Sequence, residues 1–152
     1  MEQIKKGIIE VNGITLDENT TLKDLEKIDI DKAVMRFHPH GYYELIFNRP
    51  IEKDGVAFQV SVKIAKNDGS KIILLDPKLN MPIHDIIDES RAKQEICEEW
   101  LKRNMGVEPT RDTNDGIFYD FPWGHIYSSA AEHINFGRLD GCIRIDYGEV
   151  DD

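Results

Sequence analysis

The segment from Val56 to Ile64 constrains the fold more than any other part of the chain. Its residues alternate between two sets over nine positions, and every residue of one set is a large apolar one. A period of two places each set on its own face of a strand, so the segment predicts a strand in a sheet with one buried face. Turn signals bound it at Asp54-Gly55 and Asp68-Gly69, and the apolar run from Ile72 to Leu75 returns after the second turn. The pattern predicts an antiparallel meander.

A long helix is predicted after this meander, because the hydrophobic period changes there. Six apolar residues recur at helical spacing and form one stripe: Ala92, Ile96, Cys97, Trp100, Leu101 and Met105. Asp85 or Asp88 can cap the start of this helix, and Gly106 can end it.

Shorter patterns complete the predicted fold. Asn12-Gly13 lies between two short apolar runs and predicts a hairpin, and Thr20 or Thr21 can cap a short helix that runs through Ile28. Alternating segments predict further strands over residues 33–38, 42–48, 117–121, 124–131 and 142–147. The predicted fold class is α+β: a single domain of residues 1–152, with an antiparallel β-sheet of about six or seven strands, covered on one face by one long helix, and with a short N-terminal helix.

The charge of the chain argues against a generic nucleic-acid-binding protein. Nineteen Lys and Arg stand against 29 Asp and Glu, which gives a formal net charge of −10. Binding of nucleic-acid phosphates needs clustered cationic side chains. Most of the excess lies in residues 108–152, which hold ten acids and three bases.

Hydropathy and cysteine spacing indicate a cytoplasmic protein. No apolar run approaches the roughly 20 residues that cross a bilayer, and the first residues lack the apolar stretch of a secretory signal. Cys97 and Cys142 are 45 positions apart and fit no metal-binding spacing. We expect two reduced cysteines, and no membrane association.

Two segments contain some of the residues that a metal site needs, and neither contains the full set of ligands. His38 and His40 can point the same way in an extended chain, but no third ligand lies nearby in the sequence. The segment from Arg111 to Gly116 contains the acids of a calcium loop, but its glycine comes one residue early, and position twelve is Trp123 rather than Glu. A loop and an Asx turn are the simpler interpretations, so no metal or cofactor is predicted.

A histidine–carboxylate enzyme is one alternative function. His125 and His133 could act as acid and base, with Asp120 or Asp140 as the orienting carboxylate, if the chain folds back between the two histidines. The sequence shows no coherent set of nucleophile, base and oxyanion donor, and Cys97 lies on the apolar face of the predicted helix. We therefore predict a protein that is not an enzyme, with a small hydrolase or metal-dependent enzyme as the alternative.

The most distinctive segment mixes aromatic and acidic residues between Tyr119 and Tyr127. Trp and Tyr supply rigid contact area, and acids can steer a basic partner toward them. The predicted partner-binding surface has eight members: Asp112, Asp115, Tyr119, Asp120, Trp123, Tyr127, Glu132 and Asp140. The alternative is that Phe121 and Trp123 close the core beneath the helix and that the acids are an ordinary solvated surface.

Three segments carry a family resemblance: Phe121-Pro-Trp-Gly-His-Ile126, Cys142-Ile-Arg-Ile-Asp-Tyr147 and the meander around Asp54-Gly55. In these the chain resembles small acidic bacterial immunity-type proteins of toxin–immunity systems. The resemblance implies a compact, non-enzymatic α+β protein that binds and neutralises a cognate toxin, such as a nuclease. The predicted function is therefore a protein-binding inhibitor of this type. A self-associating structural domain, joined through a sheet edge or the helix, is a further alternative.

Overall fold

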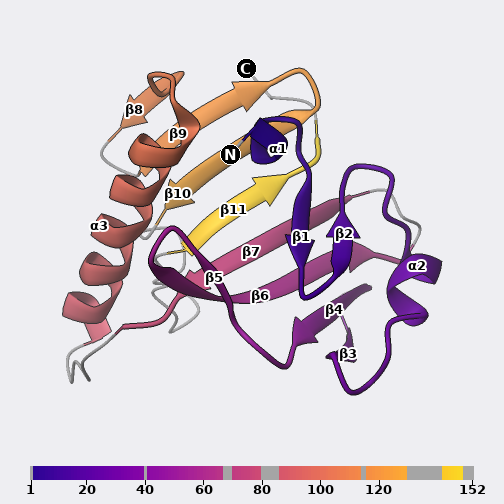
Figure 1. Ribbon diagram of the computed structural model, residues 1–152. Coiled ribbons are helices and arrows are strands. Elements are labelled where there is room, and N and C mark those ends of the chain that lie inside the picture. Colours follow the sequence, from indigo (N-terminus) through magenta and orange to yellow (C-terminus); the bar gives the residue numbers. More distant parts are fainter. Residues whose placement is uncertain are drawn as a thin grey trace.

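The computed structural model of the chain describes residues 2–39, 41–66, 70–79, 86–113, 116–129 and 142–148 (Figure 1). These residues contain three helices: α1 (Glu2–Lys5), α2 (Leu22–Glu26) and α3 (Ile86–Met105). They also contain eleven strands: β1 (Ile9–Val11), β2 (Ile14–Leu16), β3 (Ala33–His38), β4 (Tyr42–Phe47), β5 (Ile51–Lys53), β6 (Val56–Ala65), β7 (Lys71–Pro77), β8 (Arg111–Thr113), β9 (Gly116–Phe121), β10 (Gly124–Ser129) and β11 (Cys142–Asp146).

Nine of these strands form one antiparallel sheet, which confirms the predicted α+β architecture with a large antiparallel sheet. The order of eight strands is β3-β4-β6-β7-β11-β10-β9-β8. The ninth strand, β5, pairs with β6 and lies outside this linear order. The separate hairpin of β1 and β2 turns at Asn12-Gly13, as predicted. The predicted count of six or seven strands was too low. The reason is that β5 and β8 have only three residues each, too few to display a period of two.

The alternation that defines β6 is confirmed. Phe58, Val60, Val62 and Ile64 are buried on one face, which we call the inner face of the sheet; the opposite face is the outer face. β7 returns antiparallel beside β6, and β11 continues the sheet on the far side of β7. The buried side chains on the inner faces of β6, β7 and β11 therefore form one side of the hydrophobic core.

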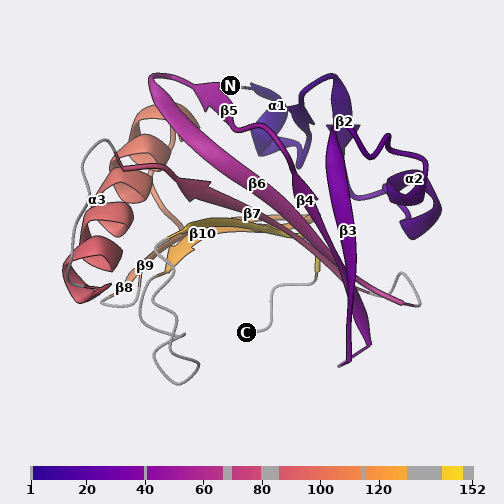
Figure 2. The ribbon, with the colours of Figure 1, turned by 90° about the horizontal axis from the view of Figure 1, so that it is seen from below.

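The long helix α3 covers only part of the inner face. It packs against β7, β9, β10 and β11, and Figures 1 and 2 show it on the same side of the sheet as the N-terminal elements. The predicted stripe supplies four buried side chains to the core: Cys97, Trp100, Leu101 and Met105. The N-terminal elements contribute five more: Ile4, Ile9, Val11, Leu16 and Leu25. The prediction of one covering helix was therefore incomplete, because α1, α2 and the β1–β2 hairpin cover the rest.

The helix ends agree with the predictions in part. α3 ends before Gly106, whose φ of +69° suits glycine. Asp88 lies inside α3 and so is not its cap, while Asp85 lies outside the described residues. Thr21 caps α2, and Asp24 completes a capping box with it. Among the described residues, no helix is long and apolar enough to span a bilayer.

β11 lies in the middle of the sheet although it comes last in the sequence. It pairs with β7 on one side and with β10 on the other. Gly124 begins β10 with a φ of +150°, and a Cβ atom there would lie 2.0 Å from the backbone oxygen of Asp146 in β11. Glycine at this position lets the two strands approach each other.

Candidate functional site

Two aromatic residues of the predicted partner-binding surface are buried. Tyr119 is 1% exposed and lies on the inner face, in the core. Tyr127 is 9% exposed and lies on the outer face, where its ring stacks on Phe118 with centroids 5.1 Å apart. The prediction that these two side chains form an exposed contact surface is therefore corrected. The alternating faces of β9 and β10 turn one ring into the core and the other against a neighbouring strand.

Trp123 anchors the N-terminal segment to the sheet. Its indole nitrogen donates a hydrogen bond to the Lys5 backbone oxygen at 2.8 Å, and its ring stacks on Phe121 with centroids 5.4 Å apart. A Cβ atom at Gly7 would lie 2.9 Å from the Trp123 ring, so the chain passes close above the indole. Trp123 is half-buried and packs against the core, which agrees with the alternative that Trp123 closes the core.

Tyr119→Phe is expected to raise the free energy of unfolding by about 1 kcal/mol. The Tyr119 hydroxyl is buried and has no hydrogen-bond partner among the described residues; burial and the charges of Glu108 and Asp112 raise its pKa. An unsatisfied buried hydroxyl destabilises a protein by about 1–3 kcal/mol. Tyr147→Phe is the matched control, because that hydroxyl donates to the Gly7 oxygen at 2.6 Å and its removal should lose about 1 kcal/mol. Urea unfolding measures both variants, and a loss of stability in Tyr119→Phe would contradict the expectation.

The predicted acidic members divide into three groups. Asp120 is bound by Arg111 through two hydrogen bonds of 3.1 and 3.0 Å. Asp112 is exposed on β8. Three acids lie outside the described residues: Asp115, Glu132 and Asp140. The carboxylate of Asp120 is thus already engaged by a cation on the neighbouring strand.

His125 lies beside a carboxylate that the prediction did not name, while Asp140, one of the two that it did name, lies outside the described residues. His125 Nε2 lies 3.6 Å from Asp146 Oδ2 on β11, whereas Asp120 is held by Arg111. Burial raises the pKa of Asp146, and the nearby His125 and Arg144 oppose that rise. Ser128 of the same strand faces the inner side of the sheet and is fully buried. The alternative of a hydrolase stays a prediction, because His133, its second histidine, lies outside the described residues.

His38 belongs to a small polar cluster on the outer face of the sheet. Its Nε2 lies 3.5 Å from Glu44 Oε1, and its ring stacks on Tyr42 with centroids 4.4 Å apart. Lys63 Nζ lies 3.9 Å from the other oxygen of the same glutamate. His40 lies outside the described residues, within which no group of three or more His, Cys, Asp or Glu is arranged to hold a metal ion.

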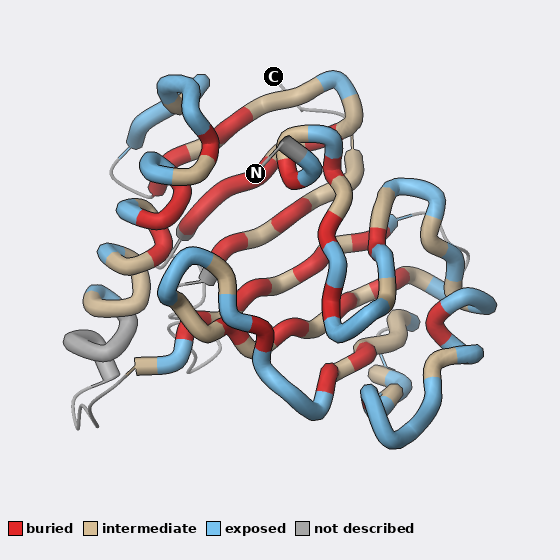
Figure 3. The backbone as a smooth tube through the Cα atoms, in the orientation of Figure 1, coloured by how far each residue is buried: buried red, intermediate tan, exposed pale blue. Residues whose placement is uncertain are grey.

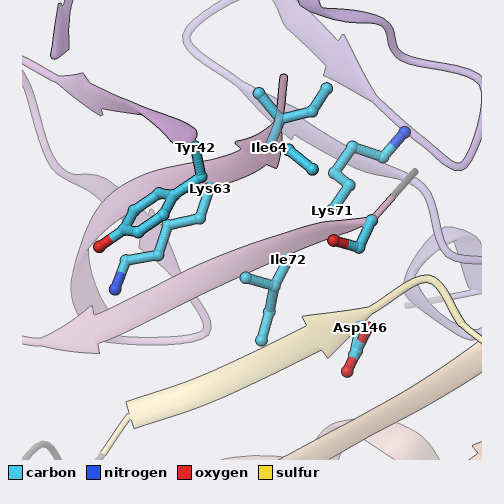
Figure 4. Close-up of a pocket in the computed structure, with 8 residues that line it drawn as sticks. Tyr42, Lys63, Ile64, Lys71, Ile72 and Asp146 are labelled. Atoms are coloured by element: carbon cyan, nitrogen blue, oxygen red, sulfur yellow. The ribbon is translucent and has the colours of Figure 1, made fainter. Parts of the chain in front are cut away.

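A pocket of about 400 Å³ opens beside the ends of β6 and β7 (Figure 4). Tyr42 and Lys63 extend together on one side of it, with Lys63 Nζ 5.8 Å from the centroid of the Tyr42 ring. Lys71 extends on the other side and donates to the backbone oxygens of Glu18 and Thr20 at 2.9 and 2.7 Å. Both lysines are engaged within the protein, so this pocket is a weaker candidate than the sheet edge described next.

Exposed apolar side chains gather around β3, at the end of the sheet. The described residues leave four large hydrophobic side chains exposed, and three of them lie within eight positions: Ile30 is 74% exposed, Val34 is 42% exposed and Phe37 is 56% exposed. Arg36 lies between them and is also exposed. We call these four residues the β3 edge surface; Figure 3 shows the exposed segments around it.

Sequence reasoning missed this surface because β3 carries an ordinary alternating pattern. Ala33, Met35 and Phe37 alternate with Val34 and Arg36, which is typical of a strand with one buried face. In the structure, Ala33 is buried and Met35 partly buried, but Phe37 is exposed, so burial fades along the strand. A signal was present at Ile30, an apolar residue between two aspartates.

Comparisons with protein-family models, with curated proteins and with solved structures found no match to this chain.

Proposed function

We propose that this protein is a non-catalytic protein-binding domain that holds its partner at the β3 edge surface. The observation that carries the proposal is the exposure of three apolar side chains at one edge of the sheet: Val34 and Phe37 on the two faces of β3, and Ile30 just before it. Covering such a side chain can contribute up to about 1.5–3 kcal/mol, and an exposed apolar edge strand is a ready site for another chain.

The proposed partner is a basic protein, and a bacterial toxin neutralised by an immunity-type inhibitor is the example that the sequence resemblance supplies. The net charge of −10 supports this choice, because it raises the rate of encounter with a positively charged partner. The apolar edge then supplies the contact that slows dissociation.

An edge variant tests the proposal. Ile30→Ser, Val34→Thr and Phe37→Thr together remove the exposed apolar area while keeping polar, strand-compatible side chains. In affinity capture from the source organism, retention of a basic partner is expected to fall more than about tenfold, since each tenfold step corresponds to only about 1.4 kcal/mol. Higher salt should loosen the partner from the unmodified protein.

Val107→Ser is the matched control. Val107 is the fourth exposed large hydrophobic residue, 52% exposed and outside the β3 edge surface, so its variant should retain the partner. Near-ultraviolet circular dichroism confirms that each variant is folded. Equal retention by the edge variant, or no basic protein retained by the unmodified chain, would contradict the proposal.

A further inference from the structure

The backbone of β3 presents donors and acceptors at the end of the sheet. The Asn48 amide donates to the Lys32 oxygen at 2.8 Å, just before the first β3–β4 residue pair. Hydrogen-bonded pairs alternate along an antiparallel ladder, so Val34 and Arg36 bond to β4. Met35 and Phe37 therefore turn their N–H and C=O groups away from β4, toward the open side of the sheet.

The side chains of β3 favour an added strand rather than a flat docking surface. Val34 is exposed on the outer face and Phe37 on the inner face, so apolar area flanks the backbone on both sides. The strand has six residues, about 20 Å at roughly 3.4 Å per residue. An incoming strand could pair with the backbone and place one of its two alternating sets of side chains against Phe37 on the inner face and the other set against Val34 on the outer face.

Arg36 indicates the chemistry of one position of that incoming strand. Its partner across the ladder is Glu44, whose carboxylate is already contacted by His38 at 3.5 Å and by Lys63 at 3.9 Å. Within the described residues Arg36 takes part in no ion pair or hydrogen bond of its side chain. Glu44 lies on the β4 side of Arg36, and a carboxylate beside Arg36 on a new strand would add a second opposite-charge pair on the open side.

We propose that β3 accepts an extended segment of a partner protein as an additional strand, with apolar side chains at alternate positions and a carboxylate beside Arg36. This inference rests on the proposed function and specifies how the partner binds. A second copy of this chain fits less well, because it would bring a second Arg36 to the same edge and a further net charge of −10. A partner that is basic overall can still carry one acidic side chain beside Arg36. Long-range attraction to this protein depends on the net charge of the partner, whereas the contact with Arg36 depends on one residue of the added strand.

A peptide titration followed by nuclear magnetic resonance tests strand addition. The probe is acetyl-Ser-Val-Thr-Val-Glu-Val-Thr-amide, and the control peptide has Lys in place of Glu. With the first peptide at about 1 mM, hydrogen exchange of the Met35 and Phe37 amides is expected to slow, while the Val34 and Arg36 amides change little. The Glu peptide should bind about two- to fivefold more tightly than the Lys peptide, and Arg36→Glu should reverse that preference. Protection at β8 instead, or no change at Met35 and Phe37, would overturn the proposal.

Two variants of Phe37 separate the backbone from the side chain. Phe37→Ala and Phe37→Pro both remove the ring, but only the second removes the outward N–H, and an edge strand tolerates proline where its N–H faces solvent. We expect Phe37→Pro to bind the Glu peptide about tenfold more weakly than Phe37→Ala. Arg36→Pro is the contrast, because it removes an N–H that bonds to β4 and should lower stability.

The outcomes distinguish this inference from the proposed function. If the edge variant loses the captured partner but Phe37→Pro and Phe37→Ala bind the peptide equally, the surface stands and strand addition fails. If the edge variant keeps the partner, the proposed function itself fails. A concentration-dependent mass in light scattering that Phe37→Pro abolishes would make a second copy the occupant and overturn the choice of a different protein.

Discussion

Gly124→Ala is expected to lower the free energy of unfolding by more than about 4 kcal/mol, at the upper end of single-residue effects. The added Cβ atom would lie 2.0 Å from the Asp146 backbone oxygen, and the φ of +150° is one that L side chains rarely adopt. The clash is with backbone, so it cannot be relieved by a side-chain rotation and must separate β10 from β11. Urea unfolding and the yield of soluble protein measure the effect.

Gly13→Ala is the matched control for this substitution. Gly13 also has a positive φ, +87°, but nothing lies within 4 Å of an added Cβ atom. The control variant should therefore lose only about 1–2 kcal/mol of stability, which is the cost of backbone strain for alanine at a positive φ. Similar losses in the two variants would show that strain alone, rather than the approach of the two strands, explains the requirement for glycine at residue 124.

Trp100→Ala is expected to destabilise the protein by about 3–5 kcal/mol. Trp100 is fully buried, its ring packs edge-on against Phe58 with centroids 5.4 Å apart, and its indole nitrogen donates to the Lys53 oxygen at 3.0 Å. One side chain thus ties α3 to the β5–β6 hairpin. Loss of the Trp100 side chain opens a cavity and leaves the Lys53 oxygen without its donor. The expected loss of about 3–5 kcal/mol is a large fraction of the roughly 5–15 kcal/mol that stabilise a typical domain.

Lys102→Ala on the exposed face of α3 is the control for Trp100→Ala. Lys102 is exposed, so its truncation should change the free energy of unfolding by no more than about 0.5 kcal/mol. Thermal and urea unfolding of both variants compare the two faces of the helix. A Trp100→Ala protein as stable as Lys102→Ala would show that α3 does not hold the β5–β6 hairpin.

The local elements could be predicted from the sequence where a period is long enough to be recognised. Nine alternating residues define β6, and the apolar stripe from Ala92 to Met105 defines α3. The order of the strands could not be predicted, because alternation shows which face of a strand is buried and not which strand lies beside it. β11 illustrates this. Its pattern predicts a strand, but its place between β7 and β10 depends on pairing with β7, whose residues lie about 70 positions earlier in the sequence.

The candidate site could be predicted less well than the fold. Tyr119 and Phe37 both lie in alternating segments, yet one is buried and the other exposed, because burial depends on which element covers each end of the sheet. The predicted surface around β8 and β9 and the proposed surface at β3 lie at opposite ends of the strand order. Both belong to the same class of function, binding of a protein, and they differ in the residues that carry it.

The central position of β11 has a consequence for the biosynthesis of this protein. β3, β4, β6 and β7 lie on one side of β11, and β10, β9 and β8 lie on the other, so within the described residues the two halves of the sheet are joined through this strand alone. A ribosome makes residues 33–129 before it makes Cys142–Asp146. Until then β7 and β10 each carry an open edge in the nascent chain, where wrong strand pairing and aggregation can begin. The sheet therefore cannot be joined between β7 and β10 in its final order until Cys142–Asp146 have been made.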